Sequence, residues 1–156
     1  MWPSTAGFLT KHVQDSRNSR AFPCGSRKLD HRAPAGDLYT GSYHRACRTT
    51  ADALQPDRLL ILSARHGLLD LDDVIDPYDT PHGTNDAITP QTLLAQATTR
   101  NILHLAPVIA LGSAHHTSLV RTLWPYAHAP LTGTRGMGEQ MARLAQLRKK
   151  YIPQHT

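Results

Sequence analysis

The sequence predicts an α/β fold with a small, mostly parallel sheet flanked by helices in a three-layer α/β/α arrangement. Two short apolar runs, RLLILSA at residues 58–64 and APVIALGS at residues 106–113, are typical of strands buried on both faces. Segments with helical periodicity alternate with these runs. This alternation favours parallel strands joined by right-handed crossovers.

The beginning of the chain differs in composition from the rest. Residues 1–20 are polar and have weak periodicity, so we interpret them as a flexible N-terminal arm. Residues 21–152 then form a single α/β domain, a length that suits one hydrophobic core. The segment RAFPCG at residues 20–25 is a candidate end of a first strand, although no apolar run precedes it.

The first expected helix follows a loop that contains Pro34, Gly36 and Gly41. We expect Cys47 to pack in the core. Two cations of this helix, Arg45 and Arg48, together with His44, are expected on its other faces, where the arginines can meet a ligand or water. Residues that fall near one face at helical spacing are Tyr39, Tyr43, Cys47, Thr50 and Leu54.

The segment after the first apolar run, RHGLLDLDDVIDPYDTPHG, is rich in Gly, Pro and Asp and predicts a long ordered loop. Thr89 and Pro90 then mark the start of a helix, as N-cap and first helical residue. The apolar side of this helix is expected to comprise Leu93, Leu94, Ala97, Ile102 and Leu105.

The second apolar run turns at Gly112–Ser113 directly into a helix, AHHTSLVRTLW, that Pro125 ends. A glycine-rich turn, TGTRGMGEQ, precedes the last helix. The core face of that helix is expected to comprise Met137, Met141 and Leu144.

Composition limits the function classes. The 17 Lys and Arg against 12 Asp and Glu give a net charge of +5, which suits an anionic partner and equally suits a solvated basic surface. No apolar run approaches the ~20 residues of a membrane span, and no secretory signal is evident. Two cysteines favour reduced thiols in the cytoplasm. The ten histidines show no metal-ligand spacing, so neither a metal nor another cofactor is expected.

Three expected strand ends carry small residues beside chemically capable ones: PCGSRK, SARHG and GSAHH. Ligands of open α/β sheets bind beyond the carboxyl ends of the strands. We therefore expect one pocket there, lined by Gly25, Ser63, Gly67, Gly112 and Ser113. Glycines admit a ligand close to the backbone, and Ser113 lies at a helix N-terminus that attracts anions, unless it only caps that helix. The full set of expected binding residues is Cys24, Gly25, Ser26, Tyr39, Arg45, Ser63, His66, Gly67, Gly112, Ser113, His115, Arg135 and Gly136.

Three further residues are candidates for catalysis. Asp76 and Tyr78 place a carboxylate and a phenol in the stiff turn DPY, where the alternative role of Asp76 is to cap the turn. Lys28 suits either a nucleophile or a phosphate-binding cation, and its alternative role is a surface charge. Arg45 and Arg135 would bind the anion together with Lys28, and Tyr39 and Tyr78 would stack or donate hydrogen bonds.

The segments GDLYTGSYHRA, LLILSARHGLLDLDDVIDPYD and TRGMGEQMARL resemble, in the same order, motifs of the YaaA family of peroxide-stress proteins. The resemblance spans about residues 23–147 and is greatest for a short actinobacterial and phage branch of unknown function. It implies DNA binding and protection from oxidative damage. The chain is shorter than YaaA proteins and has no counterpart of their additional helical DNA-binding portion.

The segment PCGSRKLD is also distantly similar to the Pro-Cys-Ser-x-x-Lys motif of archaeosine synthase, which acts on a deazaguanine base in tRNA. This similarity implies nucleobase chemistry with an essential lysine, which corresponds to Lys28. Gly25 replaces the serine of that motif.

These observations predict an enzyme that acts on a nucleobase, nucleotide or nucleic acid, by cleavage or transfer at the N-glycosidic bond or by base modification. The alternative is a non-catalytic, YaaA-like nucleic-acid-binding protein of the oxidative stress response, and a ligand sensor is a third possibility. The expected partner is a nucleotide-like small molecule or a nucleic acid, with no membrane. The sequence does not set the oligomeric state.

The net positive charge, without an evident DNA-reading helix, predicts weak and non-specific binding to duplex DNA. Affinity should fall steeply between about 50 and 200 mM salt, because binding releases counterions from the phosphates. Fluorescence anisotropy with labelled duplexes of different sequence measures this. A complex that keeps its affinity and its sequence preference in high salt would contradict the expectation and favour the nucleic-acid-binding alternative.

Overall fold

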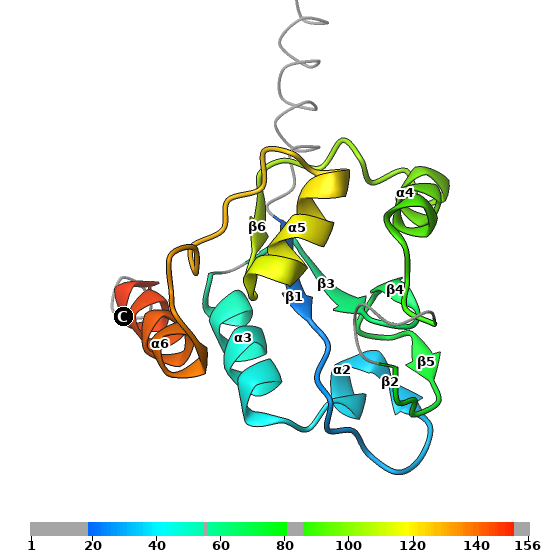
Figure 1. The fold of residues 1–156 in the computed structure, drawn as a ribbon, viewed down its shortest axis with the longest axis horizontal. Coiled ribbons are helices and arrows are strands. Elements are labelled where there is room, and N and C mark those ends of the chain that lie inside the picture. The colour runs from blue at the N-terminus through cyan, green and yellow to red at the C-terminus, as the bar shows by residue number, and fades with distance from the viewer. Residues whose placement is uncertain (1–18, 55, 81–85, 152–156) are drawn as a thin grey trace, which may run out of the picture.

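The computed structural model describes residues 19–54, 56–80 and 86–151 (Figure 1). Most of the expected N-terminal arm lies outside these residues, but Ser19 and Arg20 already belong to the first strand. In chain order the elements are β1 (Ser19–Pro23), β2 (Ala33–Pro34), α2 (Ala35–Leu38), α3 (Ser42–Ala53), β3 (Arg58–Ser63), β4 (Gly67–Leu69), β5 (Val74–Ile75), α4 (Pro90–Thr99), β6 (Val108–Ala110), α5 (Ala114–Leu123) and α6 (Met137–Tyr151).

The α/β class is confirmed, but the main sheet is mixed. Its strand order is β4-β3-β1-β6. β3 and β6 pair in parallel with β1, whereas β4 pairs antiparallel to β3. Gly67, at a φ of 78°, lets the chain turn back after β3 instead of crossing over. The expectation of a mostly parallel sheet misses this hairpin.

The segment expected to be one long loop is also more ordered than the sequence indicates. It contains β4 and then β5, which pairs antiparallel with β2 in a separate two-stranded sheet. This small sheet joins residues 33–34 to residues 74–75, so it brings the loop after β1 next to the loop that carries the DPY turn.

β1 lies between β3 and β6 in the main sheet, although its sequence contains no apolar run that would predict a buried strand. All five of its residues are buried, Arg20 included. The Arg20 guanidinium donates hydrogen bonds to the carbonyl oxygens of Ser19 and Leu54, at 3.1 and 3.3 Å. These bonds pair both terminal nitrogens of the buried guanidinium, which lowers the cost of a polar residue where a buried strand normally has an apolar one.

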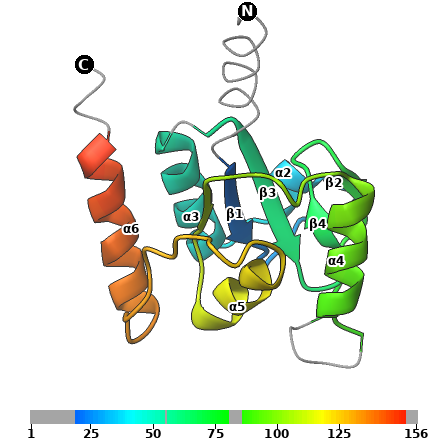
Figure 2. The ribbon, with the colours of Figure 1, turned by 90° about the horizontal axis from the view of Figure 1, so that it is seen from above.

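The two faces of the sheet pack against different helices (Figure 2). Ala21, Leu60 and Leu62 belong to a core cluster with residues of α4 and α5. Phe22 and Ile61, on the alternate positions, belong to a second cluster with residues of α2, α3 and α6. This alternation is what strands buried on both faces require.

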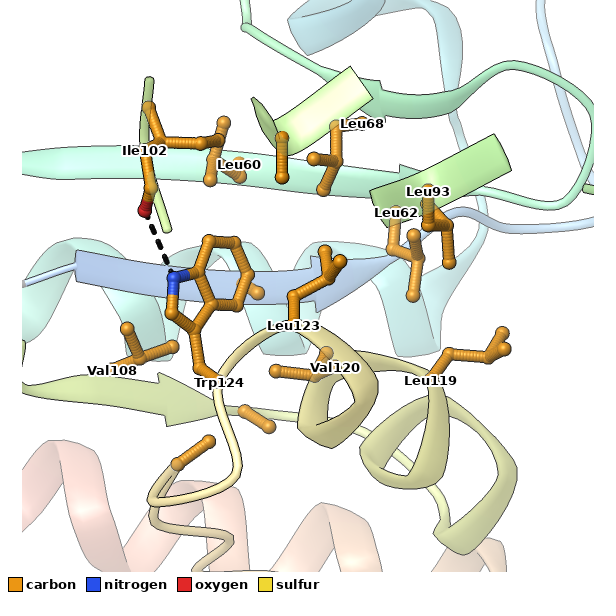
Figure 3. Packing of buried hydrophobic residues seen from close by; sticks show 14 of the residues in the cluster. Leu60, Leu62, Leu68, Leu93, Ile102, Val108, Leu119, Val120, Leu123 and Trp124 are labelled. Atoms are coloured by element: carbon orange, nitrogen blue, oxygen red, sulfur yellow. Dashed lines mark hydrogen bonds between the residues drawn. The ribbon is translucent and has the colours of Figure 1, made fainter. Parts of the chain in front are cut away.

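Trp124 closes the end of the first cluster. Its side chain is buried, and Figure 3 shows its Nε1 donating to the carbonyl oxygen of Ile102, at 3.0 Å. Because the indole N–H is paired, the large ring packs among the leucines without an unsatisfied donor.

The expected helix boundaries are correct in part. Thr89 caps α4 by accepting a hydrogen bond from the Thr92 amide, with Pro90 as the first helical residue. α5 ends at Leu123, two residues before Pro125. α3 begins at Ser42, so Tyr39 precedes the helix. Two side chains expected in the core are largely exposed: Leu94 at 47% and Met137 at 57%. Among the described residues, no helix has both the length and the apolar character that crossing a membrane requires.

The glycine at the start of β4 provides a test of this fold. A Cβ at Gly67 would lie 2.3 Å from Gln96 Oε1, whose side chain bonds the Leu68 amide and the His66 carbonyl. Gly133 has a similar φ of 86° but open space around it. We expect Gly133→Ala to cost about 1 kcal/mol through backbone strain alone, and Gly67→Ala about 3 kcal/mol because those hydrogen bonds are also lost. Urea unfolding followed by circular dichroism measures both, and equal losses would contradict the packing described.

Candidate functional site

Tyr78 joins three segments that are distant in sequence. Its phenol oxygen lies 2.6 Å from Ser63 Oγ and 2.6 Å from the Tyr39 hydroxyl. Ser63 ends β3, Tyr39 follows α2, and Tyr78 follows β5. The DPY turn that the sequence singles out therefore lies against the carboxyl end of β3.

The direction of one of these hydrogen bonds follows from the serine. Ser63 Oγ accepts from the backbone amides of Arg65 and His66, at 3.1 and 3.0 Å. A hydroxyl has two acceptor lone pairs and one proton. Both lone pairs of Ser63 are therefore used, and its O–H donates to Tyr78.

Lys28 lies over the Tyr78 ring. Its Nζ is 4.3 Å from that ring's centroid and 5.8 Å from the centroid of the Tyr39 ring. Nζ also donates to the carbonyl oxygen of Ser26, at 3.3 Å. An ammonium over a phenol face is attracted by the ring quadrupole, so the aromatic pair holds the lysine at the site.

Two cavities adjoin at Tyr78. The smaller, about 210 Å³, is called the Lys28 cavity here, and the larger, about 420 Å³, the Asp76 cavity. Both are lined by Tyr78 and Asp79, so the two cavities are neighbours. The Lys28 cavity is also lined by Cys24, Gly25, Ser26, Lys28, Ala64 and Thr80, and the Asp76 cavity by Arg32, Arg65, His66, Val74, Ile75, Asp76 and Pro77.

Charged groups of both signs line the Asp76 cavity. The carboxylate of Asp76 is 73% exposed and lies 4.0 Å from Arg32 Nη1. The His66 ring meets the Tyr78 ring edge to face, with centroids 5.1 Å apart. Burial and then the neighbouring Arg65 lower the pKa of His66, while Asp76 opposes this, so His66 is neutral at pH 7.

The two phenols are proton donors across the physiological range. Burial raises the pKa of Tyr39 to about 12, and burial also raises the pKa of Tyr78, which the nearby Cys24 raises further. Neither phenol ionises near neutral pH. Both therefore act at this site as hydroxyl groups and not as phenolates.

His44 lies behind this arrangement, in contact with Tyr39. It is buried on α3, which corrects the expectation that it lies on an outer face. Its Nδ1 is 2.8 Å from the Pro23 carbonyl oxygen, and its ring centroid is 4.9 Å from that of Tyr39. Burial lowers the pKa of His44, so the ring is neutral and donates from Nδ1.

Several expected site residues lie elsewhere. Gly67 packs against Gln96, and Gly112 lines a separate cavity of about 580 Å³ between α5 and the segment before α6. A Cβ at Gly112 would lie 2.4 Å from the His116 ring, so this glycine makes room for a core side chain. The expectation of one shared pocket is therefore wrong. Exposed residues that line neither cavity at Tyr78 are Arg45, Ser113, His115, Arg135 and Gly136.

The cations also differ from those expected. Arg48 is not free, because it donates to the carbonyl oxygen of Gly36 at 2.7 Å. Arg32 and Arg65 take the place of Arg45 and Arg135 beside the candidate site. Arg65 lies within the SARHG segment and Asp79 directly follows DPY. Their position next to these motifs could have identified both as site residues from the sequence. Nothing in the sequence points to Arg32, which reaches the site only because β2 pairs with β5.

Within the described ranges, no group of three or more His, Cys, Asp or Glu side chains is arranged to hold a metal ion.

Residues 22–146 match the model of a family described as a family of unknown function (DUF6884). The chain belongs to this family. It is also 29% identical over 135 residues to the "Uncharacterized protein YfjM" of Bacillus subtilis (strain 168), covering 79% of this chain and 89% of that protein. Both cavities at Tyr78 lie within the matched residues, and the resemblances to YaaA and archaeosine synthase stay predictions.

The buried imidazole of His44 predicts acid sensitivity of the fold. Its pKa in the folded state is below the ordinary 6.5, so the unfolded chain binds more protons below that pH. The stability is fully present above pH 6.5 and falls as the pH drops towards the lowered pKa. His44→Gln, which keeps a donor for Pro23, should flatten this dependence.

Urea unfolding at about pH 5, 6, 7 and 8 measures this dependence, because histidine titrates within that range. His104→Gln, at an exposed position, controls for the loss of any histidine. A dependence that is identical in the wild type and in His44→Gln would contradict the described burial.

Proposed function

We propose that this protein is an enzyme that acts on a nucleobase, a nucleotide or a nucleic acid, at the N-glycosidic bond or on the base itself. The observation that carries the proposal is the pair of adjoining cavities, which places Lys28 on one side of Tyr78 and Asp76 on the other. In this interpretation the domain is a three-layer α/β/α scaffold of a cytoplasmic protein, and the substrate binds beyond the carboxyl ends of its strands.

The smaller cavity suits a heterocyclic base. Its lining offers the Tyr78 ring, the Cys24 thiol and the open backbone of Gly25. Lys28 can donate from its ammonium to an oxygen or a ring nitrogen of the base. The larger cavity suits the sugar and a phosphate, because Arg32 and Arg65 can bind phosphate oxygens.

This orientation places the sugar beside Asp76. In glycosidic cleavage the bond between the anomeric carbon and the base nitrogen breaks, and its electron pair leaves with the base. The Asp76 carboxylate would stabilise the oxocarbenium ion that forms, while Lys28 or Tyr78 supplies a hydrogen bond to the departing base. Water then adds to the anomeric carbon, and its proton passes to Asp76 or to solvent.

Base modification is the second form of the proposal. It requires Lys28 to act as a nucleophile, which needs the deprotonated amine. The same cavity accommodates both forms, since Lys28 and the base would be in contact in each.

A non-catalytic nucleic-acid-binding protein of the YaaA type is the alternative. It is favoured by the net charge of +5 and by the exposed Arg32 and Arg65 beside the cavities. Both proposals predict binding of a nucleotide unit, and turnover distinguishes them.

Two substitutions test the enzyme against the binding protein. Asp76→Asn keeps the shape of the side chain, so ligand affinity should change little while turnover falls by about 10²-fold or more. Lys28→Met should weaken ligand binding if the lysine only donates a hydrogen bond to the base, and should abolish product if it is the nucleophile. Release of base from a panel of nucleosides, nucleotides and oligonucleotides is measured by liquid chromatography, with calorimetric binding in parallel.

The controls are Asp72→Asn and Lys149→Met, which change exposed residues that line neither cavity at Tyr78. If the wild type consumes no panel member, yet binds oligonucleotides and loses affinity in Lys28→Met, the enzyme proposal fails and the binding protein stands. If Asp76→Asn costs only about 1 kcal/mol of stability and leaves turnover intact, Asp76 merely caps its turn.

A further inference from the structure

The hydroxyl groups around Tyr78 carry three protons, but the two hydrogen bonds among them use only two of these protons. Three hydroxyls take part: Ser63, Tyr39 and Tyr78. The Ser63 proton goes to Tyr78, because two backbone amides occupy both serine lone pairs. The contact between the two phenols uses one phenolic proton. The second phenolic proton has no acceptor among the described residues.

This surplus proton is at the edge of the Lys28 cavity. Tyr39 is only 5% exposed, whereas Tyr78 lines the cavity itself. When Ser63 and Tyr39 both donate to the Tyr78 oxygen, the Tyr78 proton is left to point at a ligand. Hydrogen bonds in a chain polarise one another, so this arrangement makes Tyr78 a strong donor. A ligand that supplies an acceptor gains a hydrogen bond from this partly exposed hydroxyl, so such a ligand is favoured.

The polar groups of the cavity define the complementary ligand edge. Lys28 is a second donor, since its bond to Ser26 uses one of three ammonium protons. Asp79 lines the same cavity and only accepts when ionised. The matching edge therefore carries a carbonyl oxygen for Tyr78 and Lys28, and beside it an N–H for Asp79.

We propose that the Lys28 cavity recognises the lactam edge of a base, –C(=O)–NH–, and so selects oxo bases over amino bases. This inference rests on the function proposed above. Hypoxanthine, guanine, uracil and thymine carry that edge. Adenine and cytosine present an amino donor where the oxo bases present a carbonyl acceptor, so in this cavity their amino group would face Tyr78 and Lys28 donor to donor.

Matched nucleotide pairs test the selection in the wild-type chain. Inosine and adenosine 5′-monophosphates differ only in this edge, which is –C(=O)–NH– in the first and –C(NH₂)=N– in the second, and the same holds for uridine and cytidine 5′-monophosphates. Isothermal titration calorimetry should give each oxo member an affinity at least about tenfold higher than its amino counterpart, the scale of one well-placed polar pair.

Two variants locate the selection. Tyr78→Phe removes the surplus donor and should narrow the difference in affinity between the two members of each pair, because only Lys28 and Asp79 then discriminate between them. Asp79→Ala should lower the affinity for the oxo members only, and Asp72→Ala should leave both unchanged. Urea midpoints of all the variants show whether each is folded.

The outcomes separate this inference from the proposed function. A preference for oxo members that becomes smaller in Tyr78→Phe supports it. Equal binding of both members, or a preference for the amino members, overturns the lactam selection while the proposed nucleotide site stands. If none of the four nucleotides binds the wild type, the selection fails, whereas the proposed function fails only if the nucleosides and oligonucleotides of its panel are also neither bound nor consumed.

Discussion

The position of Tyr78 against Ser63 and Tyr39 determines the rest of the site. The two hydrogen bonds of 2.6 Å connect the loop after β5, the end of β3 and the segment before α3. Both cavities are lined by this one side chain. A displacement of the phenol would therefore separate Lys28 from its ring partner and change both cavities together.

Ion pairs of the acidic segment that contains Asp70 and Asp73 fix the chain just before the DPY turn, and so help to position Tyr78. The sequence alone indicates that these aspartates belong to a solvated loop. In the fold, Asp70 pairs with Arg58 at 3.2 Å and with Arg100 at 3.1 Å. Its amide bonds to the Asp73 carboxylate at 2.8 Å. Each pair alone is worth little, but partly buried charges in a network connect β3, the loop and the end of α4. Such a network limits where the following turn can lie.

The sequence predicts features of local origin well. The apolar run at residues 58–63, the Thr89 cap and the stop before Pro125 all depend on neighbouring residues, and all are observed. It fails where distant contacts decide. The hairpin of β3 and β4 requires the positive φ of Gly67, which the sequence allows but does not demand. β1 is hidden because the buried Arg20 is paired with carbonyl groups that sequence periodicity does not show.

The same limit explains the half-correct prediction of the site. DPY, Ser63, Tyr39 and the PCGSRK segment meet as expected, because strand ends and stiff turns are locally encoded. The chain just after β6, which carries Gly112, lines a separate cavity and does not meet these segments. The chain leaves β1 through α3 towards β3, and leaves β6 through α5 towards His128, which pairs in parallel with Ile109. The topological switch point thus lies between β1 and β6, where open α/β sheets commonly bind ligands.

Two histidines lie at that switch point. His44 is 2.8 Å from the Pro23 carbonyl oxygen, and His116 Nε2 is 3.2 Å from that of Ala21. Both rings are buried against β1, one from α3 and the other from α5. They fill space that a ligand would otherwise use, and His116 leaves no room for a side chain at Gly112. The accessible cavity at the carboxyl edge of β1 is therefore on its β3 side, where Cys24 and Ala64 line it together with Lys28 and Tyr78.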